Sequence, residues 1–400
     1  MPPHRVRRIR SQAHNLSTII ERRKSAVLNT IIAVVFFASH LLGIERPLPR
    51  PMHTSILSGS LWISEILLGH PERCHREIGM SAPVFLLLLA ELVAAGDLAD
   101  SRFVTAQEQV AIFVYWMVHG SSQRELQERF QRSGDTISRY INKGLSLFAA
   151  SSFYDRYVKD PVDNTSAKIL NDPRWFPFFR YCRGAINGVH VLAYVLEQHI
   201  LRCRDCHGAI TQNVLAACDF DLLFTFVMPG YEGTAADGCY YLADAAFPNC
   251  DMLLTPYRGV RYHLKEWKQG NQRPQNPQEL YNLRHAQLRV AIERCFGVNK
   301  RRFNILLSRP EIGYEQQALM MGAAAALHNF LRIHEPINDL DDDEEYDIDG
   351  HPFLAEREEG EVVDGSPVVN AAEKTRADAR RDRIAQAMWN KYVLDHPDLQ

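Results

Sequence analysis

The feature that most constrains this chain is a pair of acidic residues that lie in two different kinds of predicted local structure. Asp244 ends a short apolar, β-prone run, CYYLA at 239–243. Glu293 lies inside a helical pattern that puts Leu288, Ile292 and Phe296 on one stripe. We therefore expect an α/β domain in which a strand and a helix each present one candidate site residue.

The segments around this pair complete the predicted sheet. Strand-like runs occupy 184–195, 212–218 and 222–228, and a turn at 219–221 joins the last two. These runs alternate weakly and are strongly hydrophobic, which is typical of a sheet buried on both faces. A last core helix is predicted at 316–333.

The sequence motifs of this block resemble those of one known family. The motifs are GAI-x-G-x-H, YYLADA-x-(F/Y)P, PYRGVRYHL, ELYNLRH, LR-x-x-IER-x-FG-x-x-KRRF and LHNFLR. They are similar to those of the Harbinger transposase-derived nucleases, members of the DDE superfamily of DNA-cutting enzymes. The resemblance implies a ribonuclease H-like mixed sheet with flanking helices. It also implies hydrolysis of DNA phosphodiester bonds with Mg²⁺ or Mn²⁺ ions that carboxylates hold.

The family's three catalytic acids fall on positions 187, 244 and 293 of this chain. The resemblance therefore implies that Asp244 and Glu293 are catalytic residues and metal ligands, while Asn187 replaces the first catalytic Asp. An amide oxygen ligates a metal weakly and has no charge, so most of the attraction that holds two dications together is lost. We expect hydrolysis to be impaired or lost. Asp237 matches an acid of the family's G-(S/T)-x-x-D motif and is a further candidate metal ligand.

The connection between the third and fourth predicted strands is unusually short. The resemblance implies that this connection crosses the sheet, and relatives have a helix there that this chain lacks. The connection must cross three strand spacings of roughly 4.8 Å and return about 17 Å along the strand direction. The diagonal of these two displacements is a path of roughly 22 Å. Residues 229–237 span about 30 Å when extended. The crossing is therefore feasible, but we expect a weakened core, or a gene model that lacks an exon.

An all-α domain, 51–160, is predicted to precede the nuclease-like domain, 161–335. The run MHTSILSGSLWISEILLGHPERCHREIGMSAPVF resembles the N-terminal domain that accompanies the nuclease in fungal and plant relatives. Within 105–147, three helix start signals follow one another: TAQE at 105, SQRE at 122 and SGDT at 133. This succession predicts a helix-turn-helix-like segment.

Its third helix is the candidate recognition helix for the DNA major groove. Arg139 and Asn142 are residue types that bind guanine and adenine edges, and Lys143 suits a phosphate. Three helices joined by short turns are also a common packed core in proteins that do not bind DNA, and this alternative stays open.

Basic residues also accompany the predicted helix of Glu293. Arg289, Lys300 and Arg301 are candidates for contacts with DNA phosphates. Arg289 lies four residues before Glu293, so an intrahelical ion pair of about 0.2–0.5 kcal/mol is the alternative, and both can hold.

Charge is segregated along the chain although its net charge is only −3. Residues 1–50 contain a basic arm and an apolar stretch, 25–44, which we expect to pack as a helix, with membrane anchoring as the alternative. Residues 336–370 form an acidic segment of disordered composition, and 371–400 contain a predicted C-terminal helix. The 8 Cys are scattered and no secretory signal precedes them. We expect a nuclear protein, with the cytoplasm as the alternative.

Two classes of function follow from these observations. The first is a transposase-derived, metal-dependent DNA nuclease whose activity is impaired or lost. The second is a non-catalytic DNA-binding or protein-interaction protein domesticated from a transposase. A third possibility is a degenerate copy that does not fold stably. Relatives act with a separate Myb-like DNA-binding protein, so the implied partners are DNA and such a protein, together with further copies of this chain.

Overall fold

The computed structural model describes residues 23–38, 51–149, 152–160, 164–194, 210–228, 239–262, 273–335 and 369–397. Backbone contacts divide the chain into two units, Met1–Thr54 and Ser55–Gln400. In the first unit, residues 23–38 form a helix with exposed side chains. Among the described residues, no single helix is long and apolar enough to span a membrane, although one bent helix pair, Pro71–Ile78 with Ala82–Ala94, passes by length and composition alone.

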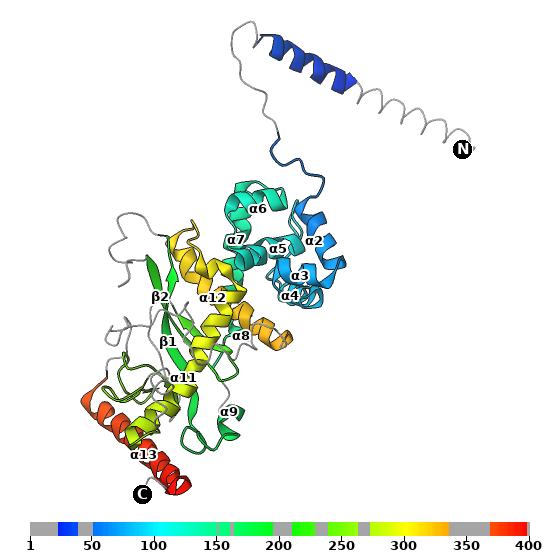
Figure 1. The fold of residues 1–400 in the computed structure, drawn as a ribbon. Coiled ribbons are helices and arrows are strands. Elements are labelled where there is room, and N and C mark those ends of the chain that lie inside the picture. Colours follow the sequence, from blue (N-terminus) through cyan, green and yellow to red (C-terminus); the bar gives the residue numbers. More distant parts are fainter. Residues whose placement is uncertain are drawn as a thin grey trace. The chain divides into compact units, whose positions relative to one another are not determined.

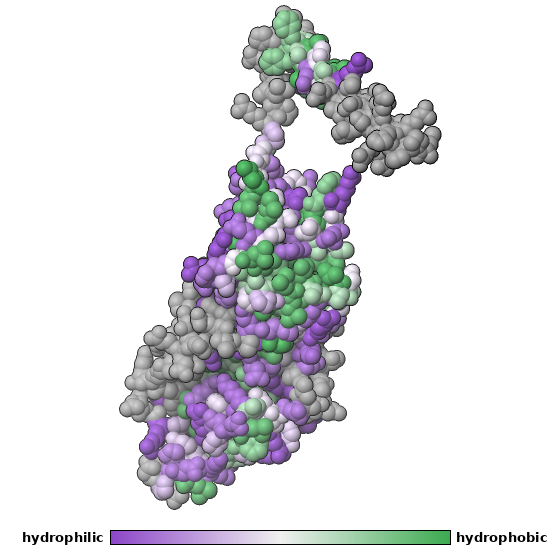
Figure 2. Space-filling view, turned by 90° about the vertical axis from the view of Figure 1, so that its right-hand side faces the viewer, coloured by the Kyte–Doolittle hydropathy of each residue, from purple (hydrophilic) through white to green (hydrophobic). Residues whose placement is uncertain are grey.

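The second unit begins with a helical region. Its elements are α2 (Gly59–Leu68), α3 (Pro71–Ile78), α4 (Ala82–Ala94), α5 (Ala106–His119), α6 (Gln123–Phe130), α7 (Gly134–Ala149) and α8 (Ser152–Tyr157). Helix α5 is the centre of this region, because it contacts every helix from α2 to α7 (Figure 1). Hydrophobic residues are also gathered over the helical region on the face drawn in Figure 2, and exposed apolar side chains of α2 and α4 include Leu61, Leu86 and Val93.

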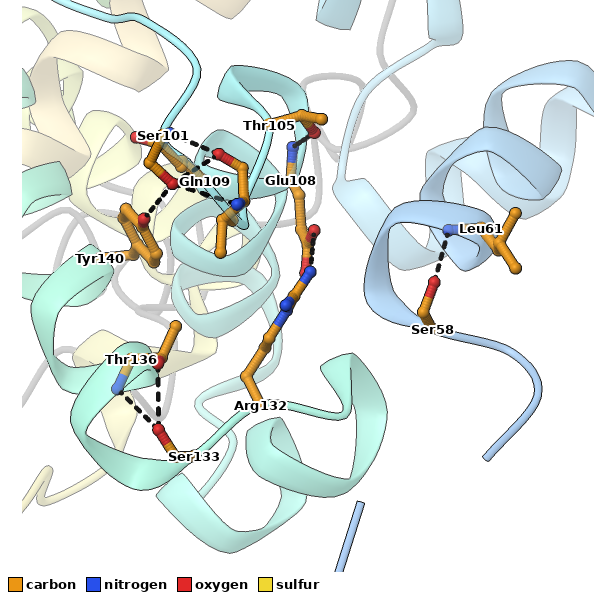
Figure 3. Close-up of polar contacts among 11 residues, drawn as sticks. Ser58, Leu61, Ser101, Thr105, Glu108, Gln109, Arg132, Ser133, Thr136 and Tyr140 are labelled. Carbon is orange, nitrogen blue, oxygen red and sulfur yellow. Dashed lines mark hydrogen bonds and ion pairs between the residues drawn. The ribbon is translucent and has the colours of Figure 1, made fainter. Parts of the chain in front are cut away.

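The predicted helix start signals in this region are confirmed. Thr105 accepts a hydrogen bond from the Glu108 N–H, and the capping box of Ser122 with Glu125 is complete. Ser133 accepts from the Thr136 N–H at the start of α7 (Figure 3). Each cap satisfies a backbone donor that the first helical turn leaves unpaired, so local sequence fixes where these helices begin.

A buried ion pair joins α5 to the segment after α6. The Glu108 carboxylate is fully buried and accepts two hydrogen bonds from Arg132, at 2.8 and 2.9 Å (Figure 3). Nearby, Trp62 of α2 packs edge-on against Tyr115 and Phe130, with ring centroids 5.6 and 5.4 Å apart. The helical region therefore has an aromatic core with one bidentate ion pair inside it.

The nuclease-like region contains a five-stranded mixed sheet in the order β3-β2-β1-β4-β5. Its strands are β1 (Cys182–Leu192), β2 (Thr211–Cys218), β3 (Phe224–Met228), β4 (Tyr240–Leu242) and β5 (Leu253–Leu254). Pairing is antiparallel from β1 to β2 and from β2 to β3, and parallel from β1 to β4 and from β4 to β5. This mixed α/β architecture is consistent with the ribonuclease H-like expectation.

The sheet order confirms that the chain crosses the sheet between β3 and β4. These strands stand three positions apart, with β2 and β1 between them, as the length estimate for the connection assumed. The crossing itself, 229–238, lies outside the described residues, and so does Asp237. Residues 336–368, which include most of the predicted acidic segment, are outside them as well.

Long helices cover one face of the sheet. The remaining elements are α9 (Ala167–Leu170), α11 (Pro277–Arg302), the 3-10 helix η2 (Asn304–Leu307), α12 (Tyr314–His334) and α13 (Ala371–Asp395). Helix α11 packs on β1, and α12 packs on both β3 and α7 (Figure 1). One large core cluster therefore joins the helical region to the sheet, and a smaller cluster lies on the sheet's opposite face.

Two helices secure the outer strands. The side-chain amide of Asn329 on α12 accepts from the Phe224 N–H at 2.8 Å and donates to the Phe224 carbonyl at 2.7 Å, so it pairs with β3 as a further peptide group would. On the other edge, Arg380 of α13 donates to the carbonyls of Cys250 and Asp251, immediately before β5. Helix α13 also packs on α11.

Candidate functional site

The middle of β1 and the end of β4 bring two of the predicted site residues into one row. Parallel pairing matches Ala185 to Leu242. Asn187 and Asp244 each lie two residues beyond that pair, so continuing the register past the end of β4 sets them side by side. Side chains alternate along a strand, and Ala185 and Leu242 belong to the core cluster that α11 covers. Asn187 and Asp244 therefore share the face of the sheet on which α11 lies.

A turn fixes Asp244. Its Oδ1 accepts the Ala246 N–H at 2.8 Å, and its carbonyl accepts the Phe247 N–H at 3.3 Å. The next carbonyl, of Ala245, accepts from Arg258 Nε at 2.9 Å. One carboxylate oxygen is thus engaged by the backbone, and the turn holds the side chain at the end of β4.

Asn187 makes a local hydrogen bond as well. Its Oδ1 accepts the N–H of Gly188 at 2.9 Å. The side chain is partly buried, and its backbone pairs with Ala216 on β2. The only oxygen that this side chain could offer to a metal ion is therefore already a hydrogen-bond acceptor.

Glu293 projects from the middle of α11. The predicted stripe of Leu288, Ile292 and Phe296 is buried, which confirms the helical pattern. Asn276 caps the helix by accepting the Glu279 N–H, and Pro277 follows at its first position. The Glu293 side chain is 30% exposed and forms an ion pair with Arg289 one turn earlier, as the alternative interpretation of that spacing predicts.

Arg289 is the centre of the charged groups at this site. Its side chain is 12% exposed, and its Nε donates to the hydroxyl of Tyr262 at 2.8 Å. Burial alone would lower the pKa of the guanidinium, but Tyr262, Glu293 and Asp244 raise that pKa overall. Burial also raises the pKa of Tyr262 to about 12, and the charges of Glu293 and Asp244 add to this rise. Both carboxylates therefore act on the same guanidinium and the same phenol.

The described residues do not fit a site for two divalent metal ions. Within the described ranges, no group of three or more His, Cys, Asp or Glu side chains could hold a metal ion. The carboxylates of Asp244 and Glu293 both act on Arg289 and Tyr262, and Glu293 already pairs with the Arg289 cation. A pair of dications needs more negative charge than this arrangement supplies.

The predicted recognition helix, α7, presents only part of its polar face to solvent. Arg139 and Asn142 are exposed, and Tyr140 and Ile141 between them are buried. Lys143 is partly buried, and its Nζ donates to Oε1 of Gln109 on α5 at 3.0 Å. Other basic candidates are also enclosed. Burial lowers the pKa of Lys300, and Arg301 is partly buried.

Comparison with known families gives one functional match. Residues 235–329 match the family model described as DDE superfamily endonuclease. This match supports a transposase-derived nuclease. It spans Asp244, Tyr262, Arg289 and Glu293, whereas Asn187 lies before it. Residues 54–150 match a domain of unknown function (DUF8040). Searches of curated proteins and of solved structures found no match.

Tyr262 is the site residue that sequence reasoning missed. Its hydroxyl accepts from Arg289 across 27 positions of sequence, and its ring is 8% exposed. This tyrosine belongs to the motif PYRGVRYHL, and that motif is the sequence signal that could have identified it as a site residue. No periodicity links that motif to the helix of Glu293.

Proposed function

We propose that this protein is a transposase-derived DDE-type nuclease in which metal-dependent hydrolysis of DNA phosphodiester bonds is impaired or lost. One observation supports the proposal above all. Extended by two residues, the register of β1 with β4 sets the amide of Asn187, in the middle of β1, beside Asp244, just after β4, and the amide oxygen already accepts a hydrogen bond. The family match supports the nuclease ancestry of the region that contains Asp244 and Glu293.

The second candidate is a non-catalytic DNA-binding or protein-interaction protein. The Arg289–Glu293 ion pair favours it, because this pair stabilises the helix without any metal ion. In this proposal α7 binds DNA through the exposed Arg139 and Asn142, and a Myb-like protein or another copy of the chain is the partner. The nucleus is the compartment that fits such a protein.

Plasmid cleavage with Mg²⁺ or Mn²⁺ tests the first proposal. The natural chain, Asn187→Asp and Asn187→Asp with Glu293→Gln are compared on supercoiled DNA, and binding of the same DNA is followed by gel shift. We expect cleavage by Asn187→Asp alone, since that change restores the third carboxylate. Adding Arg139→Ala and Asn142→Ala to each chain is expected to weaken the gel shift without changing the order of the cleavage rates.

The outcomes separate the candidates. Cleavage by the natural chain at the rate of Asn187→Asp, with cleavage lost in the variant that also carries Glu293→Gln, refutes the proposal that activity is impaired. If all three chains are folded and bind DNA but none cleaves it, the DNA-binding protein replaces the nuclease as the better account.

A further inference from the structure

The charge balance of the site differs from what its acids alone suggest. Asp244 and Glu293 contribute two negative charges, and the Arg289 guanidinium contributes one positive charge among them. The cluster is therefore left with one net negative charge. A dication placed there would give the partly buried cluster a net positive charge, which a low-dielectric environment penalises.

The guanidinium of Arg289 is held in place beside the two acids by direct contacts. It is anchored by two contacts from different directions: Nε donates to the Tyr262 hydroxyl, and Nη2 pairs with Glu293 one turn later on the same helix. Tyr262 is itself buried, so moving the guanidinium away would take a hydrogen-bond donor from a buried hydroxyl that also pairs with His285 Nδ1 at 3.5 Å. An arginine cannot relieve the balance by releasing a proton, since its guanidinium stays protonated in proteins.

We propose that Arg289 is the resident counter-cation of Asp244 and Glu293, and that these carboxylates bind a divalent cation only when the cluster gains one more negative charge. This inference rests on the proposed ancestry of the site and deepens it. It makes Arg289 a positioning residue that pairs directly with Glu293 and attracts Asp244 in the absence of metal. Two unlike substitutions then become equivalent in charge: Asn187→Asp adds a carboxylate, and Arg289→Gln removes the cation.

Mn²⁺ binding, measured as the loss of the free-ion signal in electron paramagnetic resonance, tests the proposal without any measurement of cleavage. The set comprises the natural chain, Asp244→Asn, Asn187→Asp, Arg289→Gln, Arg289→Met, Arg289→Lys and Arg289→Gln with Asp244→Asn. Arg76→Gln is the matched control, because it breaks another i,i+4 ion pair, Arg76–Glu72 on α3, which is exposed and distant in sequence from both acids. Circular dichroism establishes that each chain is folded.

We expect Arg289→Gln and Arg289→Met to tighten Mn²⁺ binding at least about tenfold relative to the natural chain. Arg289→Lys keeps the charge and should bind as weakly as the natural chain, as should Arg76→Gln. Adding Asp244→Asn to Arg289→Gln should abolish the gain.

Three results would overturn the proposal. One is tight, Asp244-dependent binding by the natural chain. Another is equal binding by Arg289→Lys and Arg289→Gln, since charge would then not matter. The third is a gain in Asn187→Asp without any gain in folded Arg289→Gln and Arg289→Met. That last result leaves the proposed nuclease ancestry intact, whereas cleavage results bear on the ancestry and not on Arg289.

Discussion

Replacing Arg132 by Met should strongly destabilise the helical region. The substitution removes the partner of the Glu108 carboxylate, which is 0% exposed, and leaves a charge inside the protein with no cation. Loss of one member of a buried ion pair costs about 3–5 kcal/mol. Because the Arg132 side chain is 23% exposed, water can approach from its side after truncation, so we expect the lower end, about 3 kcal/mol.

The companion variants turn this figure into a test of mechanism. Glu108→Met leaves Arg132 able to turn toward solvent and should cost less, about 1–2 kcal/mol. The double variant removes both charges and fills the space with apolar atoms, so it should be more stable than Arg132→Met alone. The two single effects are therefore not additive.

Urea denaturation followed by tryptophan fluorescence measures these differences, and Trp62 and Trp116 are buried reporters in the same region. With a slope of about 3 kcal/mol/M, the Arg132→Met midpoint should fall by about 1 M. A shift below about 0.3 M, or a double variant less stable than Arg132→Met, would refute the account of Glu108 as a carboxylate that depends on its cation.

Two further predictions concern the sheet. Gly184→Ala should lower the free energy of unfolding by at least about 2 kcal/mol, since its new Cβ would lie 1.9 Å from the carbonyl oxygen of Cys218 and force β1 away from β2. Gly297→Ala on α11 is the control. Its Cβ meets nothing within 4 Å, so this change should not destabilise the protein. Equal losses of stability for Gly184→Ala and Gly297→Ala in urea denaturation would contradict this account of the contact with Cys218. Burial raises the pKa of Asp219 from 3.8 to about 6, so the folded state holds its proton more tightly than the unfolded state, and stability should fall as pH rises through that interval. The amide oxygen of Asp219→Asn can still accept hydrogen bonds from the N–H groups of Asp221 and Leu223. The variant should therefore lose the fall in melting temperature that the natural chain shows as pH rises through this interval. A pH profile of the melting temperature that the substitution leaves unchanged would contradict this role of Asp219.

The parts of the fold that sequence predicts well are those with local causes. Thr105 and Ser122 cap α5 and α6 as the start signals predict, because a cap involves residues only three positions apart. The Asp219 turn is also local, and its side chain accepts the N–H groups of Asp221 and Leu223. The crossing from β3 to β4 followed from the family resemblance rather than from any local pattern.

Contacts between distant segments limit what the sequence predicts about the site. The Arg289–Glu293 ion pair could be foreseen from its spacing, but the bond from Arg289 to Tyr262 could not. Lys143 was assigned to phosphate on its position along a helix, whereas its hydrogen bond to Gln109 depends on how α5 and α7 pack. A helical pattern predicts on which face of the helix a side chain lies, but it does not predict which residue of another segment that side chain contacts.

The attachment of α13 sets an order for folding during synthesis. Arg380 binds the carbonyls of Cys250 and Asp251 about 130 positions earlier in the chain, so the edge beside β5 lacks this cover until translation has passed position 380. At roughly 5–20 residues per second, that interval lasts about 6–26 s on the ribosome. An uncovered sheet edge is a site for pairing with other chains. Translation of α13 therefore marks the moment at which that edge becomes protected against such pairing.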